Sequence, residues 1–161
     1  MTLRHRPVAI SDLPQICSFS QSAEELFYLF PKAAYPLTCE QLQQAIQQRA
    51  DASVVEQNGK VVAFANFYRW DHGGDCAIGN VIVAPQARRS GVGRYLIEQM
   101  VALAFRKYQA SSVSVSCFNH NVAGLLFYPS LGFTPYAIES RADPTGQQLA
   151  LIHLHLLRQP D

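Results

Sequence analysis

The order of predicted elements indicates an α/β fold with a mixed central sheet of about seven strands, flanked by helices. Two observations support this prediction. In the middle of the chain, three segments rich in β-branched and apolar residues follow one another with only short polar turns between them, which is typical of an antiparallel meander. In the second half, strand and helix patterns alternate, which is typical of crossover connections between parallel strands. A sheet with both kinds of connection is mixed and is not doubly wound.

The first part of the chain is predicted to contain one strand and three helices. Residues 3–8 are expected to form the strand, and Ser11 is expected to cap the first helix. Residues 20–37 combine helix formers, aromatic residues and two prolines, which predicts a short helix followed by an irregular loop. Thr38 is expected to cap a third helix, which carries an apolar stripe.

The meander begins with a hairpin. Residues 52–56 and 60–68 flank the pair Asn58-Gly59, the strongest short-range signal for a tight β-turn. A polar turn then leads into a third strand over residues 77–83.

Helices and strands alternate after the meander. A long helix is predicted over about residues 91–108, a strand over 112–118 and a short helix over 122–131. Residues 134–141 and 147–157 are expected to close the sheet as an antiparallel pair.

Length and composition favour one soluble domain over residues 1–161. Thirteen Lys and Arg residues against twelve Asp and Glu leave a formal charge of +1, so we expect no nucleic-acid partner. The four cysteines show no metal-ligand spacing, and we expect no metal. Because no apolar stretch has the length of a membrane span and no signal sequence is present, a cytoplasmic location without a membrane partner is expected.

Residues 80–94, NVIVAPQARRSGVGR, are the stretch most informative about chemistry. A β-branched strand runs into a basic turn that contains glycine and opens directly into a helix. Glycine lets backbone amides approach a ligand closely, and the helix N-terminus adds a partial positive charge. Together with the three arginines of this stretch, these features predict a diphosphate-binding loop.

Three known phosphate-binding loops were compared with this stretch. A Walker A loop ends in Gly-Lys-Ser/Thr, which is absent. A dinucleotide-binding fingerprint needs a third glycine where this chain has Leu96, and no acidic residue closes the next strand. The spacing Arg88-x-x-Gly91-x-Gly93 instead resembles the acyl-CoA-binding motif of the GNAT N-acetyltransferase superfamily.

A second motif of the same superfamily is similar to a segment that follows the next strand: Asn121-x-x-Gly124-x-x-Phe127-Tyr128-x-x-x-Gly132-Phe133. Tyr128 can also be explained as a core aromatic residue and Gly132 as a helix C-terminal cap. The two motifs stand in the order typical of the family, and the predicted element order matches the family over essentially the whole chain.

The resemblance implies a V-shaped sheet whose strands 77–83 and 112–118 splay apart at one end. It also implies acetyl-CoA as co-substrate. The pantetheine arm would lie in the gap and pair with the backbone of Val81, Ile82 and Val83, and Asn121 would contact this arm. The pyrophosphate would lie on the backbone amides of the following loop and helix start: Arg88, Arg89, Ser90, Gly91, Val92, Gly93 and Arg94.

The implied reaction is direct attack of a neutral amine on the thioester in a ternary complex. Tyr128 is expected to act as the general acid to the CoA thiolate, and the Val83 N–H to stabilise the oxyanion. The general base remains open, because the splayed strands carry Asn80, Ser114 and Ser116 and no carboxylate. The candidates that could replace a strand carboxylate, each of which could also be a solvated surface group, are Asp75, Glu24, Glu25, His72, His120 and Glu139.

The acceptor side is expected near Glu24, Glu25, Phe27 and Tyr28, because acids beside aromatic residues suit a cationic amine. A surface helix that packs its aromatic residues on the sheet explains them equally well. The acceptor is a small molecule or a protein. The alternative function is a non-catalytic acyl-CoA-binding or sensor module. We expect a monomer or a homodimer, because residues 149–157 are predicted to form an exposed final strand that could pair across a dimer.

Overall fold

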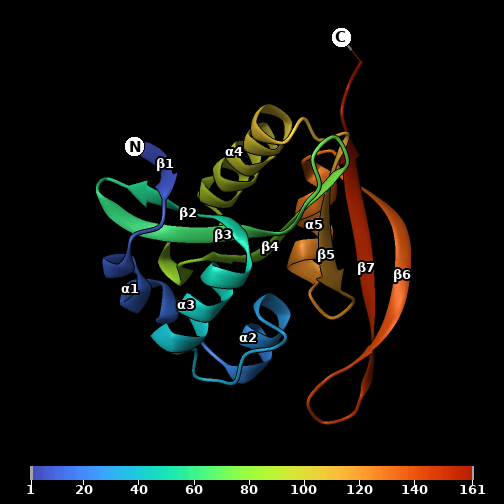
Figure 1. Ribbon diagram of the computed structural model, residues 1–161. Helices are drawn as coiled ribbons and strands as arrows, with labels where there is room; N and C mark the ends of the chain where they lie inside the picture. The colour runs from blue at the N-terminus through green and yellow to red at the C-terminus, as the bar shows by residue number, and fades with distance from the viewer. Residues whose placement is uncertain (1, 161) are drawn as a thin grey trace.

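The computed structural model describes residues 2–160. Seven strands form one sheet in the order β1-β2-β3-β4-β5-β7-β6, so the predicted mixed sheet is confirmed (Figure 1). The strands are β1 (Leu3–Pro7), β2 (Ala50–Gln57), β3 (Lys60–Trp70), β4 (Asp75–Val83), β5 (Ser112–Phe118), β6 (Thr134–Ala142) and β7 (Gln148–Leu157). The α-helices are α1 (Leu13–Cys17), α2 (Ala23–Leu29), α3 (Cys39–Gln48), α4 (Val92–Lys107) and α5 (Val122–Ser130).

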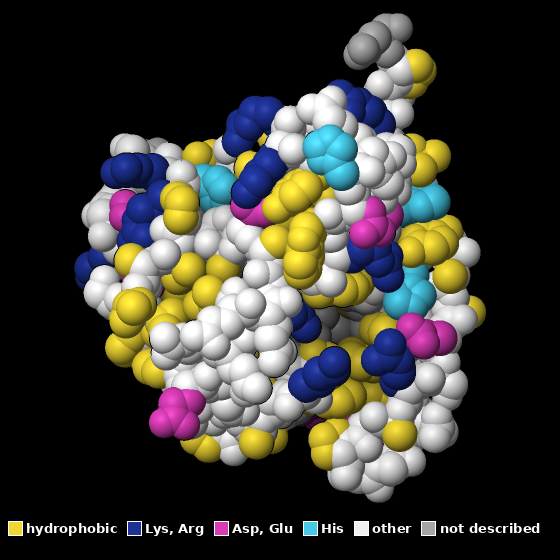
Figure 2. All heavy atoms as spheres, viewed as in Figure 1, with side chains coloured by type: hydrophobic (Ala, Val, Ile, Leu, Met, Phe, Trp, Pro, Cys, Tyr) yellow, Lys and Arg dark blue, Asp and Glu magenta, His cyan; other side chains and the backbone are white. Residues whose placement is uncertain are grey.

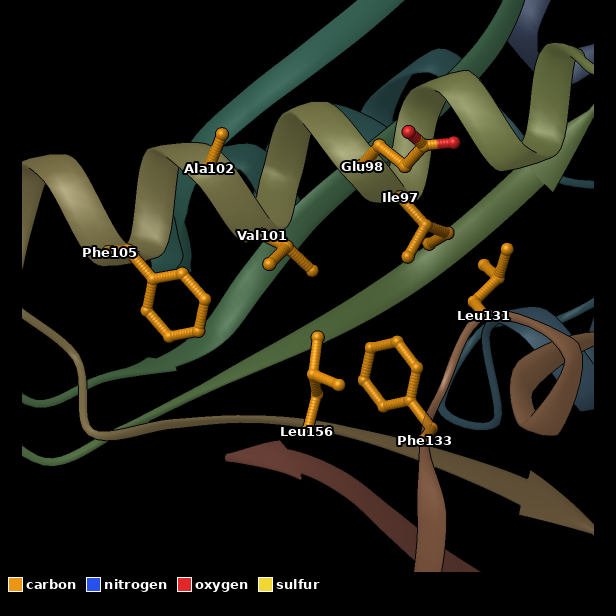
Figure 3. A pocket seen from close by; sticks show the side chains of 8 residues that line it. All are labelled: Ile97, Glu98, Val101, Ala102, Phe105, Leu131, Phe133 and Leu156. Atoms are coloured by element: carbon orange, nitrogen blue, oxygen red, sulfur yellow. The ribbon is translucent and has the colours of Figure 1, made fainter. Parts of the chain in front are cut away.

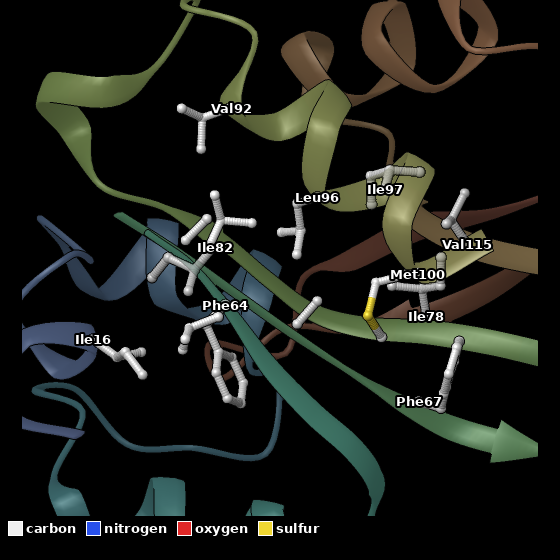
Figure 4. Close-up of a cluster of buried hydrophobic side chains, with 14 of the residues drawn as sticks. Ile16, Phe64, Phe67, Ile78, Ile82, Val92, Leu96, Ile97, Met100 and Val115 are labelled. Carbon is white, nitrogen blue, oxygen red and sulfur yellow. The ribbon is translucent and has the colours of Figure 1, made fainter. Parts of the chain in front are cut away.

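Helices cover both faces of the sheet. In Figure 1, α4 lies on one face of β2–β4, and α1, α2 and α3 lie on the other. The β3 segment 61–67 is buried throughout because both of its faces are covered. The apolar stripe of α4 includes Leu96, Ile97 and Met100, which point from the helix toward the sheet in Figure 4. The core therefore has two layers, and the sheet runs between them.

Several predicted turns and caps are confirmed. Asn58 and Gly59 both have a positive φ, of 53° and 85°, as the tight hairpin between β2 and β3 requires. Thr38 caps α3, since its hydroxyl accepts a hydrogen bond from the Gln41 amide at 3.3 Å. Gly132 has φ 98° directly after α5, which confirms its role as a cap.

The predicted cap at Ser11 is wrong. Ser11 lies inside a 3-10 turn, Ile10–Asp12, that precedes α1. The neighbouring Asp12 satisfies this turn instead, because its carboxylate accepts from the Ala9 amide at 2.7 Å. The same carboxylate binds both terminal nitrogens of Arg6, at 2.8 and 3.0 Å. A charged side chain with a second partner in β1 thus replaces the serine as the capping group.

The prediction that the final strand is exposed and pairs across a dimer is also wrong. β7 lies inside the sheet, between β5 and β6. After α5 the chain forms β6 at the outer edge of the sheet. It then reverses direction, and β7 pairs with β6 on one side and with β5 on the other. The exposed edge is β6, in which all nine residues are exposed.

β4 and β5 form the predicted V. They pair in parallel only from Asp75–Ala77 to Ser112–Ser114. Beyond Ala77, β4 contains an irregularity at Asn80, which has φ 49°. The Asn80 side chain is held by Asn66, at 2.9 Å, and by the Leu29 carbonyl, at 2.8 Å. We call the point where the strands part, just past Ala77 and Ser114, the apex.

Candidate active site

The loop before α4 presents free backbone amides. Arg89 and Gly91 have φ values of 60° and 90°, which turn the chain into the helix. Among the described residues, the amides of Arg89, Ser90 and Gly91 have no hydrogen-bond partner. α4 has no side-chain cap and no acidic residue in its first turn. The helix dipole and the open amides therefore favour an anion at this point.

The predicted arginines of this loop differ in their partners. Arg88 donates to the Glu25 carboxylate at 2.6 Å. The Arg94 guanidinium lies 3.8 Å from Glu98 and 3.5 Å from the Ser130 carbonyl. Arg89 is exposed and forms no ion pair within residues 2–160. Arg89 and the amides are thus free to meet a ligand, while Arg88 joins the loop to α2.

The edge of β4 that faces the gap has open backbone N–H groups, while the Val83 carbonyl accepts from Arg88 Nε at 3.1 Å. The Ala84 amide donates to the Val62 carbonyl of β3 at 2.7 Å. Since successive residues of a strand point their amides to opposite sides, the Val83 N–H is directed away from β3, toward the gap. The Val81 N–H has the same direction, because Ile82 between them pairs with β3. The N–H groups of Val81 and Val83 are thus available to an extended ligand in the gap.

Tyr128 of α5 is buried, with 8% of its surface exposed. Its ring packs against Phe127 and Phe133, at centroid distances of 5.2 and 5.9 Å. Its hydroxyl has no hydrogen-bond partner among the described residues. Burial raises the pKa of this phenol well above its ordinary value, and the nearby Cys117 and Tyr68 raise it further. Tyr128 therefore keeps its proton at neutral pH, and its hydroxyl can act as a proton donor.

Asn121 caps α5 and brings that helix onto β5. Its side-chain oxygen accepts from the Gly124 amide at 3.1 Å. A Cβ on Gly124 would lie 2.6 Å from the Cys117 sulfur, so only glycine allows this approach. Burial raises the pKa of the Cys117 thiol to about 11. Cys117 is consequently a neutral packing residue at physiological pH.

The acceptor-side residues predicted on α2 lie together over the end of β5. Phe27 stacks on Phe118 with centroids 4.8 Å apart, and Tyr28 lies 6.2 Å from the same ring. The Tyr28 hydroxyl donates to Glu24 at 3.0 Å. The aromatic residues therefore pack on the sheet, and both acids, Glu24 and Glu25, have partners.

The surface is hollowed beside these elements. Figure 2 shows a hollow between the bulk of the molecule and the strands β6 and β7, with several Lys or Arg side chains around it. A His and an Asp or Glu side chain lie on the rim formed by β6 and β7. A separate apolar pocket of about 350 Å³ lies between α4 and the start of β6, and its lining includes none of the predicted site residues (Figure 3).

A profile of the acetyltransferase (GNAT) family matches residues 15–133. The chain belongs to the GNAT family. As a GNAT acetyltransferase, it moves an acetyl group from acetyl-CoA, its co-substrate, to an amine. The family predicted from the two motifs is confirmed.

Solved structures support the GNAT fold over the full chain. The ribosomal-protein-S18-alanine N-acetyltransferase of Escherichia coli is 23% identical with a TM-score of 0.75, and the match covers 99% of this chain and 96% of that one. Spermidine N-acetyltransferase of Vibrio cholerae, solved with CoA and spermine, is 16% identical with a TM-score of 0.79, and the match covers 96% and 95%. The YncA protein of Salmonella typhimurium, solved with acetyl-CoA, is 19% identical with a TM-score of 0.75 over 99% and 95%.

The fit to the GNAT co-substrate rests on the chain's own features. Along the chain, the open N–H groups of β4 at residues 81 and 83 are followed by the free amides of residues 89–91. No group of three metal-binding side chains is found within residues 2–160. Within the same range, no helix has the length and apolar character needed to cross a membrane.

Sequence reasoning missed three residues near the apex of this GNAT protein. Tyr68 lies over Gly79, where a Cβ would be 2.7 Å from its ring. Arg49 lies beside that ring and has no acidic partner within the described residues. His153 contacts both Ser116 and Glu139. The paired register of β5 and β7 creates these last contacts, and only the alternating histidines of β7 hinted at them.

Two of the predicted candidates for the general base are engaged elsewhere. Asp75 forms an ion pair with Arg69 at 2.9 Å. It also accepts from Ser112 and Ser114, at 2.7 and 2.8 Å. Glu25 is held by Arg88. Both carboxylates are therefore occupied by charged or hydroxyl partners in this structure.

Proposed function

We propose that this chain acetylates a primary amine by direct attack on acetyl-CoA in a ternary complex. The observation that carries the proposal is the open edge of β4 at residues 81–83, which ends in a loop of free amides. An extended arm with a diphosphate at one end fits this arrangement. The arm would pair with β4, and the diphosphate would lie on the amides of residues 88–94.

Two groups along the gap are suited to the chemical step. The Val83 N–H, directed into the gap, can donate to the carbonyl oxygen as negative charge develops there. Tyr128 can donate its proton to the departing sulfur, since its raised pKa keeps it protonated. Asn121 would contact the CoA arm from the start of α5 while it caps that helix.

The neutral state of Cys117 supports direct attack over an acyl-enzyme. Its pKa of about 11 leaves almost no thiolate at neutral pH. Its thiol also faces the Asn121 carbonyl at 3.6 Å, on the side of α5. The two substrates would therefore react side by side, and their proximity supplies much of the acceleration.

The acceptor is proposed to enter beside α2, where Phe27, Tyr28 and Glu24 lie near the open end of β5. Two structural neighbours are named for spermidine and for a ribosomal-protein alanine, so both a small polyamine and a protein N-terminus are candidate acceptors. We further propose a cytoplasmic protein without a nucleic-acid partner, as a monomer or a homodimer. Four free cysteines support the reducing compartment.

The first test is a thermal-shift comparison of acetyl-CoA, CoA, NADH and ATP. A ligand at 100 times its Kd stabilises the folded state by about 2.7 kcal/mol. Shifts with both CoA species, and none with NADH or ATP, are expected. No shift with either CoA species would refute the donor site.

Turnover then separates the enzyme from a non-catalytic acyl-CoA-binding or sensor module. Release of free thiol is measured with a panel that includes spermidine and an alanine-initiated peptide. Tyr128→Phe should keep CoA binding and lose about tenfold or more in kcat. Binding without thiol release on any amine would favour the sensor function.

A further inference from the structure

Four polar side chains from four strands form a continuous hydrogen-bonded row that starts at the apex. The Tyr68 hydroxyl lies 3.2 Å from Ser116 Oγ. Ser116 Oγ lies 2.7 Å from Nδ1 of His153. Nε2 of the same imidazole lies 2.8 Å from a Glu139 carboxylate oxygen. The row therefore connects the gap between the splayed strands with a carboxylate on β6.

The register of the sheet builds this row. Ser116 and His153 are direct partners on the antiparallel strands β5 and β7, so their side chains stand on the same face. Glu139 reaches the imidazole from β6, where it lies two residues along from Ala137, the register partner of His153. Four separate strands hold the row, and each side chain has a fixed neighbour.

Tyr68 completes the row from the opposite arm of the V. Its ring crosses β4 at Gly79, where any Cβ would come within 2.7 Å of it. The hydroxyl then meets Ser116, although β3 and β5 are not adjacent strands. Because β4 and β5 stop pairing at Ala77 and Ser114, this hydroxyl lies where the gap opens. Tyr68 is 37% exposed and accessible to an acceptor.

The hydrogen bonds have a defined direction. The Arg141 and His153 side chains hold the pKa of the Glu139 carboxyl below its usual range, so Glu139 is ionised and only accepts. Nε2 of neutral His153 must therefore carry the proton, and Nδ1 is free to accept from the Ser116 hydroxyl. Ser116 Oγ in turn accepts from the Tyr68 hydroxyl. Tyr68 is left with a free lone pair at the gap.

We infer that Tyr68, Ser116 and His153 relay the proton of the attacking amine to the imidazole, with Glu139 as the positioning residue that stabilises the imidazolium. The inference rests on the proposed function and supplies the general base that it lacks. The splayed strands carry no carboxylate that could act as the base. In its place, two hydroxyl groups would pass the proton to an imidazole that is hydrogen-bonded to a carboxylate.

As the N–C bond forms, the amine proton passes to the Tyr68 oxygen, the Tyr68 proton to Ser116, and the Ser116 proton to Nδ1 of His153. As the C–S bond breaks, Tyr128 gives its proton to the sulfur. His153 then releases a proton to solvent and Tyr128 takes one up, so the net products are an amide and a thiol.

The groups that face His153 determine how the relay depends on pH. Glu139 of β6 contacts Nε2 and also pairs with Arg141, Ser116 of β5 contacts Nδ1, and the Tyr136 ring of β6 lies 6.1 Å from the imidazole. Tyr68 of β3, with Arg69 over its ring, is connected to the imidazole through Ser116. His155 lies on its own strand and stacks on Tyr136. Because only an unprotonated imidazole can accept a proton, a relay that ends on this ring requires kcat to fall at acidic pH.

The test compares His153→Gln with the matched control His155→Gln, a histidine two residues along the same strand whose ring has no hydrogen bond to Ser116. His153→Gln should lower kcat about a hundredfold, with the KM for acetyl-CoA unchanged, and should remove the acidic limb of the pH profile. His155→Gln should behave as wild type. Tyr68→Phe and Ser116→Ala should each reproduce the loss in kcat.

Wild-type kcat and pH profile in His153→Gln would overturn the relay while leaving the proposed function intact. Equal losses in both histidine variants would overturn it as well. A second measurement does not depend on the acceptor: ¹⁵N NMR of the imidazole at about pH 8 should find the proton on Nε2. A proton on Nδ1 would overturn the relay, whereas failure of acetyl-CoA to bind would overturn the proposed function.

Discussion

The guanidinium of Arg88 donates to the carboxylate of Glu25 at 2.6 Å, which joins the loop before α4 to helix α2. The same guanidinium donates through Nε to the Val83 carbonyl at 3.1 Å. One side chain thus spans the proposed phosphate loop, the edge of β4 and the helix on the acceptor side. A change in α2 should therefore alter the position of the loop of residues 88–94.

Glu25→Gln tests this connection, because it removes the charge and keeps the shape. A partly exposed ion pair contributes about 0.2–1 kcal/mol, so the free energy of unfolding should fall by less than about 1 kcal/mol. The KM for the amine should rise, since α2 loses its tie to the loop. Steady-state kinetics would measure this with Glu40→Gln, a change at an exposed acid of α3, as the control, and equal changes in both variants would contradict it.

Gly91→Asp should abolish acetyl-CoA binding. Gly91 has φ 90° and its Cβ position is open, so the variant can fold with modest strain. Its carboxylate would stand beside the free amides, where a diphosphate would be repelled. Gly91→Asn is the matched control, because asparagine has the same shape without the charge. Calorimetry should find binding in the Asn variant and none in the Asp variant; similar affinities would place the phosphates elsewhere.

Gly124→Ala should destabilise the fold by about 1–3 kcal/mol, because its Cβ would lie 2.6 Å from the Cys117 sulfur. Cys117→Ala removes that sulfur. The double variant should therefore be less destabilised than the sum of the two single variants predicts, as denaturant unfolding can measure. Additive effects would show that the sulfur is not the obstacle and that the Asn121 side chain, 2.9 Å from the same Cβ, is the obstacle.

Asp12 should make the stability of the fold sensitive to acid. Hydrogen bonds from Arg6 and from the Ala9 amide hold the pKa of its carboxyl below the ordinary value. A lowered pKa in the folded state contributes stability that is complete above the unfolded pKa of about 3.9 and is lost as the pH falls through the folded value. Asp12→Asn should reduce the free energy of unfolding near neutral pH and flatten its acid dependence. Ser11→Ala should change neither, and a larger effect at Ser11 would contradict this assignment.

Local signals in the sequence were sufficient for most elements. Asn58-Gly59 and Asp143–Gly146 mark their turns by residue type alone, and the Asp143 carboxylate accepts from the backbone of its own turn. The prediction of a phosphate-binding loop has the same local basis, since its glycines and arginines lie close together in the chain, over residues 88–94. These features depend on neighbours in the chain.

Features that depend on strand order were not predictable. The interior position of β7 follows from the return of the chain at β6, and nothing in the residues 149–157 determines it. The contacts of His153 follow from a register between strands far apart in sequence. Glu139 was one of six candidate bases, and only the fold joins it to Ser116 through an imidazole.

The short pairing between β4 and β5 has a mechanical consequence. The sheet consists of two leaves, β1–β4 and β5–β7, whose hydrogen-bonded seam is confined to residues 75–77 and 112–114. A ligand that hydrogen-bonds to β4 while its far end lies against α5 would connect these two parts of the sheet where they do not pair directly. Bound acetyl-CoA would then restrict the relative motion of the two parts of the sheet. The protein would be most rigid when both substrates are bound.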